Sequence, residues 1–227
     1  MAKTALVTGG NRGIGFEIVK GLASLGVNVL LAARRKEDAQ EAAKLTGLEN
    51  ISAVKLDLSE QRNIAAQIST IQAEFGDIDI LVNNAGILIA EPLAEVAITD
   101  VMQSFQVNTF AALELMQLLL PGMQKGGFGR IVNLSSGWGS FYEGMEGPIA
   151  YAASKAALNA ITINAAKQVE GDIKINAMCP GWVHTRMGGK EAPKTPEQGA
   201  DTAIWLATLA SEGPTGQFFR ERTAINW

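Results

Sequence analysis

Tyr151 and Lys155 are four residues apart, the spacing of two side chains on one face of a helix. A lysine ammonium about 4 Å from a phenol favours the phenolate by roughly 4 kcal/mol at intermediate dielectric. We therefore expect Lys155 to lower the pKa of Tyr151 from about 10 toward neutrality. A tyrosine with such a pKa can act as a general acid or base.

Ser136 stands at the end of an apolar segment upstream of this pair and could donate a hydrogen bond to a substrate oxygen. Its neighbour Ser135 is the less favoured member of the serine pair. A Tyr-x-x-x-Lys pair alone indicates little, because such pairs occur by chance in many helices. The interpretation depends on finding the pair together with a strand-end serine and a nucleotide-binding loop.

A glycine-rich loop, Thr8–Gly15, follows the first apolar segment of the chain and precedes a helical pattern. Glycines allow a tight turn and let backbone N–H groups approach a pyrophosphate, and a helix N-terminus favours negative charge. The spacing G-x3-G-x-G differs from the common G-x-G-x-x-G fingerprint. The alternative is an ordinary strand-to-helix turn, which the loop's position after the first strand makes less favourable.

The end of the second apolar segment indicates which dinucleotide would bind. NAD-binding proteins place an acidic residue there to hold the ribose 2′-hydroxyl, but this chain has Ala33 followed by Arg34 and Arg35. Guanidinium groups pair with phosphate through two parallel hydrogen bonds, and Arg12 could reach the same group. We expect NADP(H) rather than NAD(H). For Arg35, the solvated start of a helix is an equal alternative.

Short, continuously apolar segments alternate with segments of helical periodicity along the whole chain. Such segments are typical of strands buried on both faces of a parallel sheet. Their alternation with helices predicts a doubly wound α/β fold, a Rossmann-type parallel sheet of about seven strands with helices on both faces. The expected strands are Thr4–Thr8, Val27–Ala32, Ile51–Leu56, Ile78–Val82, Arg130–Leu134, Ile173–Met178 and Gly216–Phe219. The expected helices lie near residues 13–25, 36–46, 60–75, 99–124, 149–168 and 196–211.

We expect residues 1–227 to form a single domain. Ligands of open parallel sheets bind beyond the carboxyl ends of the strands. The loops 87–97, 137–150 and 182–196 would form the substrate pocket there. They carry apolar and aromatic residues, and the pocket residues that we favour are Trp138, Tyr142, Trp182 and Met187. A hydrophobic ketone or aldehyde fits such a pocket better than a sugar or a carboxylate.

Composition excludes several other classes of protein. The 227 residues are 47% hydrophobic and 19% charged, a balance that excludes intrinsic disorder. A net charge of −4 argues against a nucleic-acid-binding surface. The single cysteine, Cys179, allows no internal disulfide, and the single histidine, His184, gives little basis for a metal site. Without a signal peptide or a membrane-spanning segment, we expect a cytoplasmic protein that does not bind membranes.

Further motifs follow the predicted strands in a fixed order, and together they resemble a known family. They are Thr8–Gly15, Asp57, Asn83–Gly86, Asn108, Ser136, Tyr151, Lys155 and Pro180–Gly181 with Thr185. The chain is similar over essentially its whole length to the compact, single-domain short-chain dehydrogenases/reductases. Within that family it most resembles the NADPH-dependent carbonyl reductases, and the tail residues 195–200 and 213–219 support this.

The resemblance implies a reversible reduction in which NADPH delivers hydride and Tyr151 protonates the carbonyl oxygen. Lys155 would lower the pKa of Tyr151 and bind the nicotinamide ribose, Ser136 would polarise the carbonyl, and Asn108 would hold a water leading from Lys155 to solvent. Besides Tyr151 and Lys155, the implied cofactor-binding residues are Gly9, Asn11, Arg12, Gly13, Ile14, Gly15, Arg34, Arg35, Asp57, Leu58, Asn84, Ala85, Gly86, Pro180, Gly181, Val183 and Thr185. Asp57 could instead be a plain helix-start residue, and Asn108 could mark a helix kink.

The resemblance also suggests an assembly. Animal carbonyl reductases of this type carry an inserted helical segment before the catalytic tyrosine that blocks oligomerisation, and here the segment between Ser136 and Tyr151 is too short to hold it. In the wider family, the helices that correspond to residues 99–124 and 149–168 pack across a two-fold axis. We therefore expect a homodimer or homotetramer.

Two other functions remain open from the sequence. An NADP(H)-binding sensor that no longer turns over substrate would bind the cofactor without reducing any carbonyl, although such proteins usually lose the tyrosine or the lysine. Sugar-nucleotide epimerisation or dehydration is the other, but those relatives generally have G-x-x-G-x-x-G spacing and an additional substrate domain.

Overall fold

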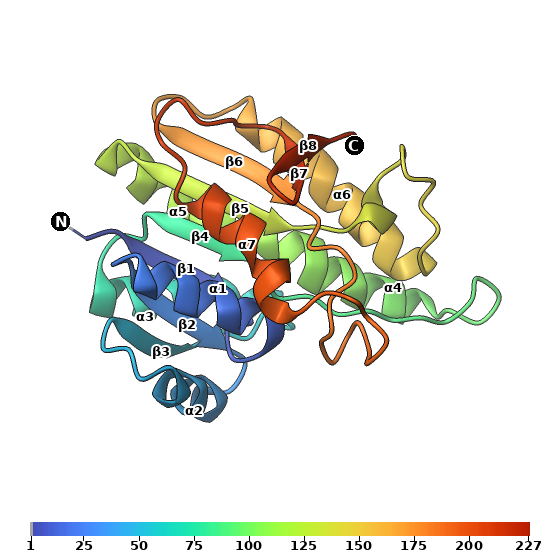
Figure 1. The fold of residues 1–227 in the computed structure, drawn as a ribbon, viewed down its shortest axis with the longest axis horizontal. Coiled ribbons are helices and arrows are strands. Elements are labelled where there is room, and N and C mark those ends of the chain that lie inside the picture. The colour runs from blue at the N-terminus through green and yellow to red at the C-terminus, as the bar shows by residue number, and fades with distance from the viewer. Residues whose placement is uncertain (1) are drawn as a thin grey trace.

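The computed structural model describes residues 2–227, in which one sheet forms the centre of the molecule. Its strands occur in the order β3-β2-β1-β4-β5-β6-β7-β8 (Figure 1). The strands are β1 (Thr4–Thr8), β2 (Asn28–Ala33), β3 (Ile51–Lys55), β4 (Ile80–Asn83), β5 (Gly129–Leu134), β6 (Ile173–Met178), β7 (Phe218–Arg220) and β8 (Thr223–Ile225). The first seven strands run parallel, which confirms the doubly wound fold predicted from the sequence.

β8 is an eighth strand that the sequence pattern did not predict. It pairs antiparallel with β7 at the edge of the sheet, and the turn between them contains Glu221 and Arg222 at φ of 50° and 59°. The strand is only three residues long and mostly exposed, so it lacks the apolar run by which the other strands were recognised. Trp227 then stacks on Phe218, with ring centroids 5.3 Å apart, and fixes the end of the chain against this edge.

Helices cover both faces of the sheet (Figure 1). They are α1 (Gly13–Ser24), α2 (Lys36–Thr46), α3 (Gln61–Phe75), α4 (Ile98–Phe105), α5 (Ala111–Gly126), α6 (Ile149–Ala166) and α7 (Pro196–Ala207). The buried side chains of α1, α2 and α7 form one apolar core with the sheet, and those of α3 and α5, with partly buried residues of α6, form a second. This two-sided burial explains why the strands are continuously apolar.

The helix expected over residues 99–124 is interrupted in the structure. α4 passes into η1, a π-helical segment (Gln106–Phe110), before α5 begins at Ala111. Asn108 lies in the middle of this segment. π-Helical turns inside α-helices are frequent at functional sites. The apolar periodicity of the sequence does not predict such a turn, because it changes the helix over only a few residues.

The strand order reverses beside β1, since the chain moves from β1 outward to β3 and then returns to β4 on the other side. Loops that follow β1 and β4 therefore diverge at the carboxyl edge of the sheet, where ligands bind in such folds. Among residues 2–227, no helix is both long enough and apolar enough to cross a membrane.

Candidate active site

The glycine-rich loop lies between β1 and α1 and leaves the start of that helix open. Gly9 and Gly13 have φ of 63° and 55°, a backbone region that favours glycine. A Cβ on Gly15 would lie 2.3 Å from the carbonyl oxygen of Gly9, so the loop closes on itself only without a side chain there. Asn84 Nδ2 donates to Thr8 O at 2.8 Å and to Gly9 O at 3.1 Å, which ties the loop after β4 to the loop after β1.

The first turn of α1 offers its backbone N–H groups to an anion. Within the described chain, Arg12 at the N-cap position makes no capping hydrogen bond with its side chain. A Cβ on Gly13 would lie 3.2 Å from Thr185 Cγ2, so Thr185 reaches this loop from the segment after β6. A helix N-terminus of this kind accommodates a phosphate, and its residues therefore fit the pyrophosphate of a dinucleotide.

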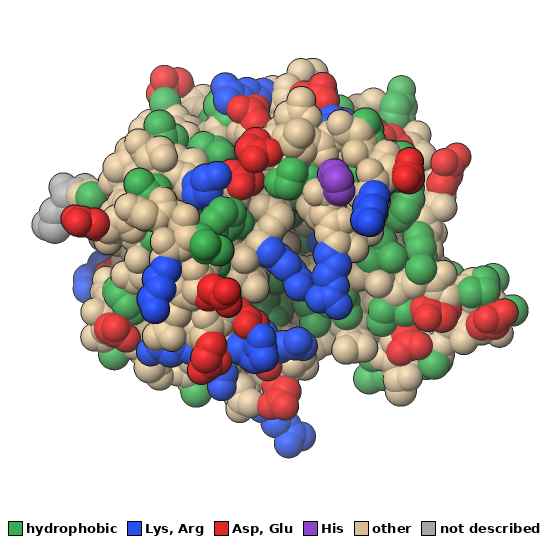
Figure 2. Space-filling view, turned by 60° about the horizontal axis from the view of Figure 1, so that its bottom comes forward, with side chains coloured by type: hydrophobic (Ala, Val, Ile, Leu, Met, Phe, Trp, Pro, Cys, Tyr) green, Lys and Arg blue, Asp and Glu red, His purple; other side chains and the backbone are tan. Residues whose placement is uncertain are grey.

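Three arginines surround the end of β2. Arg35 Nε donates to Asp38 Oδ2 at 3.0 Å, and the pKa of Asp38 is lowered first by its hydrogen bond to Arg35 and further by the charges of Arg12 and Arg34. Arg12 and Arg34 are exposed, and within residues 2–227 neither makes an ion pair. Lys and Arg side chains gather beside a hollow of the molecular surface in Figure 2. This group fits an additional phosphate, with Arg35 held by Asp38 and the other two more accessible.

Tyr151 and Lys155 are buried side by side near the start of α6. Their exposed fractions are 8% and 4%, and Lys155 Nζ lies 5.7 Å from the centre of the Tyr151 ring. The ammonium donates to Leu134 O at 2.7 Å, at the end of β5. The sequence prediction that these two residues share one helix face is confirmed.

For the protein's own groups, the predicted effect of Lys155 on the Tyr151 pKa is wrong. Burial removes solvation from the phenolate and raises the pKa to about 12, while a hydrogen bond from Ser136 opposes this increase. Burial likewise lowers the pKa of Lys155 to about 8. The sequence argument counted the attraction between the two groups, and it could not count the loss of water that both of them suffer in the fold.

Ser136 rather than Ser135 faces the tyrosine. Ser136 is half-buried, accepts a hydrogen bond from the N–H of Trp138 at 3.2 Å, and interacts with the Tyr151 hydroxyl. Ser135 is buried and its hydroxyl donates to Lys155 O at 3.4 Å. The structure thus brings Ser136, Tyr151 and Lys155 together from β5 and α6.

Asn108 anchors the loop after β4 to α6. Its Oδ1 accepts from Ile87 N at 2.8 Å, and its Nδ2 donates to Ile87 O at 2.9 Å and to Ser154 Oγ at 3.0 Å. A Cβ on Gly86 would lie 3.2 Å from Asn108 Oδ1 and 3.6 Å from Lys155 Nζ, so Asn108 and Lys155 converge on this glycine. The position of Asn108 in the π-helical segment agrees with the helix kink that the sequence left as an alternative, and its role toward a water stays a prediction.

The other expected cofactor residues lie along the same edge of the sheet. Asp57 Oδ1 accepts from the N–H and hydroxyl of Ser59 at 3.0 and 2.6 Å, so the carboxylate closes the turn after β3. The alternative that Asp57 starts a helix is wrong, because α3 begins at Gln61 with Glu60 at its N-cap. Leu58 and Val183 are buried. The expected residues that are half-buried at this edge, Ile14 in the first turn of α1 and the others on loops, are Asn11, Ile14, Ala85, Gly86, Pro180, Gly181 and Thr185.

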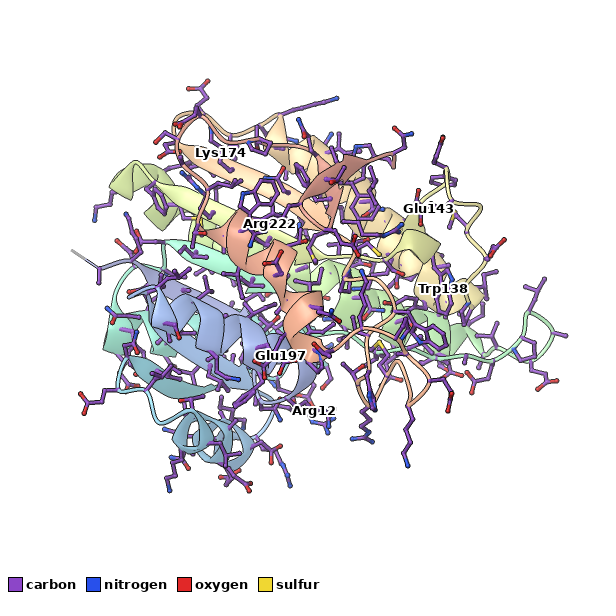
Figure 3. The ribbon with its side chains drawn as sticks, viewed as in Figure 1. Arg12, Trp138, Glu143, Lys174, Glu197 and Arg222 are labelled. Atoms are coloured by element: carbon purple, nitrogen blue, oxygen red, sulfur yellow. The ribbon has the colours of Figure 1, made fainter. Side chains whose placement is uncertain are left out.

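The four expected pocket residues are all partly exposed, and they differ in their contacts. Trp138 packs edge-on against Tyr151, with ring centroids 6.1 Å apart. Trp182 Nε1 donates to Gly188 O at 2.7 Å, within the loop after β6. Met187 lies in the same loop, and its side chain is 47% exposed. Tyr142 is 75% exposed. Figure 3 shows Trp138 beside α6 and Arg12 beside the start of α1. Trp138 is therefore the pocket residue that the fold brings to Tyr151.

Known proteins resemble this chain in both sequence and structure. The sequence profile described as short chain dehydrogenase matches residues 3–196. The human protein named carbonyl reductase (NADPH) 1 is 33% identical over 282 residues, covering 98% of each chain. Carbonyl reductase Sniffer of Drosophila melanogaster has a TM-score of 0.90 at 28% identity, covering 100% of both chains. An NADPH-bound carbonyl reductase from chicken fatty liver has a TM-score of 0.88 at 29% identity, covering 100% of this chain and 99% of that chain.

Proposed function

The chain belongs to the short-chain dehydrogenase family of oxidoreductases, and from this premise we propose that it reduces the carbonyl group of a hydrophobic ketone or aldehyde with NADPH. The observation that carries the proposal is the convergence of Ser136, Tyr151 and Lys155 beside the glycine loop. An NADP(H)-binding sensor needs no such group.

NADP(H) fits the residues of the glycine loop and of the arginine group, and when bound it supplies the hydride for the carbonyl carbon. The open start of α1 suits the pyrophosphate, and Arg34 with Arg12 suits a 2′-phosphate. The printed names of two similar proteins include NADPH, which also supports NADP(H) as the cofactor of this chain. Lys155 would hold the nicotinamide ribose, as the family resemblance implies.

Tyr151 would act as the proton donor. With a pKa of about 12 the phenol is protonated at neutral pH, which is the state that carbonyl reduction requires. Ser136 would orient the carbonyl oxygen toward the phenol by donating a hydrogen bond to it. After the proton leaves, the nearby Lys155 ammonium stabilises the phenolate, and Asn108, which converges with Lys155 on Gly86, would hold the water that restores the proton.

Alcohol oxidation, the reverse reaction, needs the phenolate of Tyr151 as a base, so we expect its rate to rise as the pH rises. The apolar and aromatic side chains around Tyr151 favour a hydrophobic substrate. The test is a panel of ketones, aldehydes and sugars assayed in parallel with NADPH and NADH. Loss of NADPH absorbance with hydrophobic carbonyls is the expected result, and tight NADPH binding without turnover on any of them would favour the sensor instead.

Arg34 tests the cofactor choice separately. Replacing it by alanine removes a charge-assisted contact, so we expect Arg34→Ala to weaken NADPH binding about tenfold and leave NADH binding unchanged. Lys36→Ala, which removes an exposed cation two residues further on, is the matched control. Binding of both dinucleotides can be followed by their fluorescence, and equal effects of Arg34→Ala on NADPH and NADH would contradict the assignment.

We also propose that the chain forms a homodimer or homotetramer through α5. A groove along this helix is lined by Gln61, Phe110, Leu113, Glu114, Gln117 and Leu118. Phe110 is 45% exposed there, and Glu114 Oε2 is enclosed without a hydrogen-bond partner among the described residues. A second copy on this face would cover the phenylalanine and could supply a donor to the carboxyl group.

A cytoplasmic location stays a prediction from the sequence.

A further inference from the structure

The β7–β8 turn carries three consecutive charged residues, and each of them pairs with a different part of the molecule. Arg220 Nη2 lies 2.7 Å from Glu143 Oε2, on the loop before α6. Glu221 Oε1 lies 2.6 Å from Lys194 Nζ, on the loop before α7. Arg222 Nε donates to Asp201 Oδ2 at 2.8 Å, on α7 itself. In Figure 3, Arg222 lies beside α7, away from Glu143.

Two of these ion pairs lie directly against glycines of the candidate active site. A Cβ on Gly137 would lie 2.2 Å from Glu143 Oε2 and 2.7 Å from Arg220 Nη2. A Cβ on Gly181 would lie 2.7 Å from Lys194 Nζ. Gly137 follows Ser136 after β5, and Gly181 follows Pro180 after β6. The Arg222–Asp201 pair has no such contact with a glycine of the site in the described chain.

The sulfur of Cys179 joins the same two turns. It accepts hydrogen bonds from Gly137 N at 3.2 Å, from Gly181 N at 3.4 Å and from Arg220 Nη2 at 3.4 Å. Cys179 is only 5% exposed, so these contacts lie inside the fold. Each glycine therefore bonds to the sulfur through its N–H and also lies against a charged pair.

The end of the chain binds the outer part of the loop between β5 and α6. Tyr142 N donates to Trp227 O at 3.1 Å, and Ser140 Oγ donates to Asn226 O at 3.2 Å. The β7–β8 hairpin and the residues after it thus contact both loops between which a substrate would lie.

We propose that Arg220 and Glu221 are positioning residues that hold the Ser136–Gly137 turn and the Pro180–Gly181 turn at a fixed separation beside Tyr151. The inference rests on the proposed carbonyl reduction. Arg220, with Glu143, sets the position of the serine hydroxyl relative to the phenol. Glu221, through Lys194, sets the segment expected at the nicotinamide. Neither residue touches the reacting atoms, so their effect is on geometry.

Misplacement of a reacting group by about 1 Å can reduce a rate by up to roughly 100-fold. We expect Arg220→Gln to lower kcat about tenfold, while NADPH affinity at the distant glycine loop changes less than about twofold. Arg220→Lys keeps the charge and should retain most of kcat. Arg222→Gln, which removes an ion pair of the same turn without contact to the site, should leave kcat unchanged.

A double-mutant cycle identifies the pair responsible. Glu143→Gln should lower kcat in the same direction as Arg220→Gln, which also removes the contact with Cys179 Sγ. The double variant should lose less than the two single losses combined, because both changes remove the Arg220–Glu143 pair. Glu221→Gln should raise the KM for NADPH more than it lowers kcat, because Lys194 is then free to leave Gly181. Equal losses of kcat in Arg220→Gln and Arg222→Gln, or fully additive losses in the cycle, would overturn the proposal.

Amide hydrogen exchange tests the positioning role of Arg220 and Glu221 independently of the proposed carbonyl reduction. If the unaltered protein reduces no carbonyl, the proposed function fails, and the positioning is read from the amide exchange of Gly137 and Gly181. Arg220→Gln should accelerate exchange at Gly137, Glu221→Gln at Gly181, and Arg222→Gln at neither. Unchanged exchange in both of the first two variants would refute the positioning independently of activity.

Discussion

At the scale of single residues, burial changes the chemistry of the Tyr151–Lys155 pair. The same enclosure raises the pKa of the phenol to about 12 and lowers that of the ammonium to about 8, because each is more stable in its neutral form when water is excluded. The phenol is consequently ready to donate a proton, while the ammonium remains mostly charged at neutral pH. The two shifts give predictions for activity and for stability.

Tyr151→Phe tests the proton donor. The ring keeps its packing against Trp138 but loses the hydroxyl. We expect carbonyl reduction to fall by a factor of about 100 to 10,000, the usual contribution of general acid catalysis. NADPH binding, measured by fluorescence, should be nearly unchanged. A variant that retains full turnover would exclude Tyr151 as the acid.

Lys155→Met tests the cost of burying the ammonium. Between the folded pKa of about 8 and the unfolded value of 10.5, the unfolded chain binds more protons, so this lysine makes the protein more stable as pH rises. From about pH 7.5 to about pH 9.5 the gain for the unaltered protein is roughly 2 kcal/mol, and it is absent in Lys155→Met. Urea unfolding at the two pH values measures the difference, and parallel pH profiles for the two proteins would contradict it.

At the scale of elements, the loops rather than the strands decide what the site can bind. The conformation of the glycine loop is stabilised by the packing of Gly15 against the backbone of Gly9 and by the hydrogen bonds from Asn84 to two carbonyl groups of the loop. The π-helical turn at Asn108 performs a similar function on the other side, since it joins the loop after β4 to α6.

Gly15→Ala tests the geometry of the glycine loop. The new methyl group would overlap the Gly9 carbonyl, so the loop must move away from the start of α1. We expect NADPH affinity to fall at least tenfold, about 1.4 kcal/mol, together with a lower Tm. Gly126→Ala, at the end of α5, is the control, because no atom lies within 4 Å of the added Cβ. Calorimetric titration of both variants with NADPH measures the affinities. An unchanged NADPH affinity in Gly15→Ala would contradict the proposed role of the glycine loop.

At the scale of the whole molecule, the two faces of the sheet have different environments. The face covered by α1, α2 and α7 packs against its own helices, whereas on the other face Phe110, at the end of η1, and the groove along α5 are exposed. An exposed aromatic side chain in such a groove is typical of an interface.

Phe110→Lys tests the proposed assembly. The lysine can pair with Glu114 one turn further on, so the helix should remain intact while the apolar contact is lost. We expect a dimer or tetramer in the unaltered protein and a large shift toward monomer in the variant, measured by sedimentation velocity across a concentration series. A monomeric unaltered protein would refute the proposed assembly.

The sequence by itself determined the order of the elements, the parallel sheet and the identity of the residues that gather at its carboxyl edge. It could do so because apolar periodicity and glycine spacing are local properties of the chain. Only the tertiary structure decided the direction of the Tyr151 pKa, the π-helical turn at Asn108 and the ion pairs of Arg220 and Glu221. These features depend on which distant groups meet and on how much water remains between them, and neighbouring residues in the sequence do not specify either.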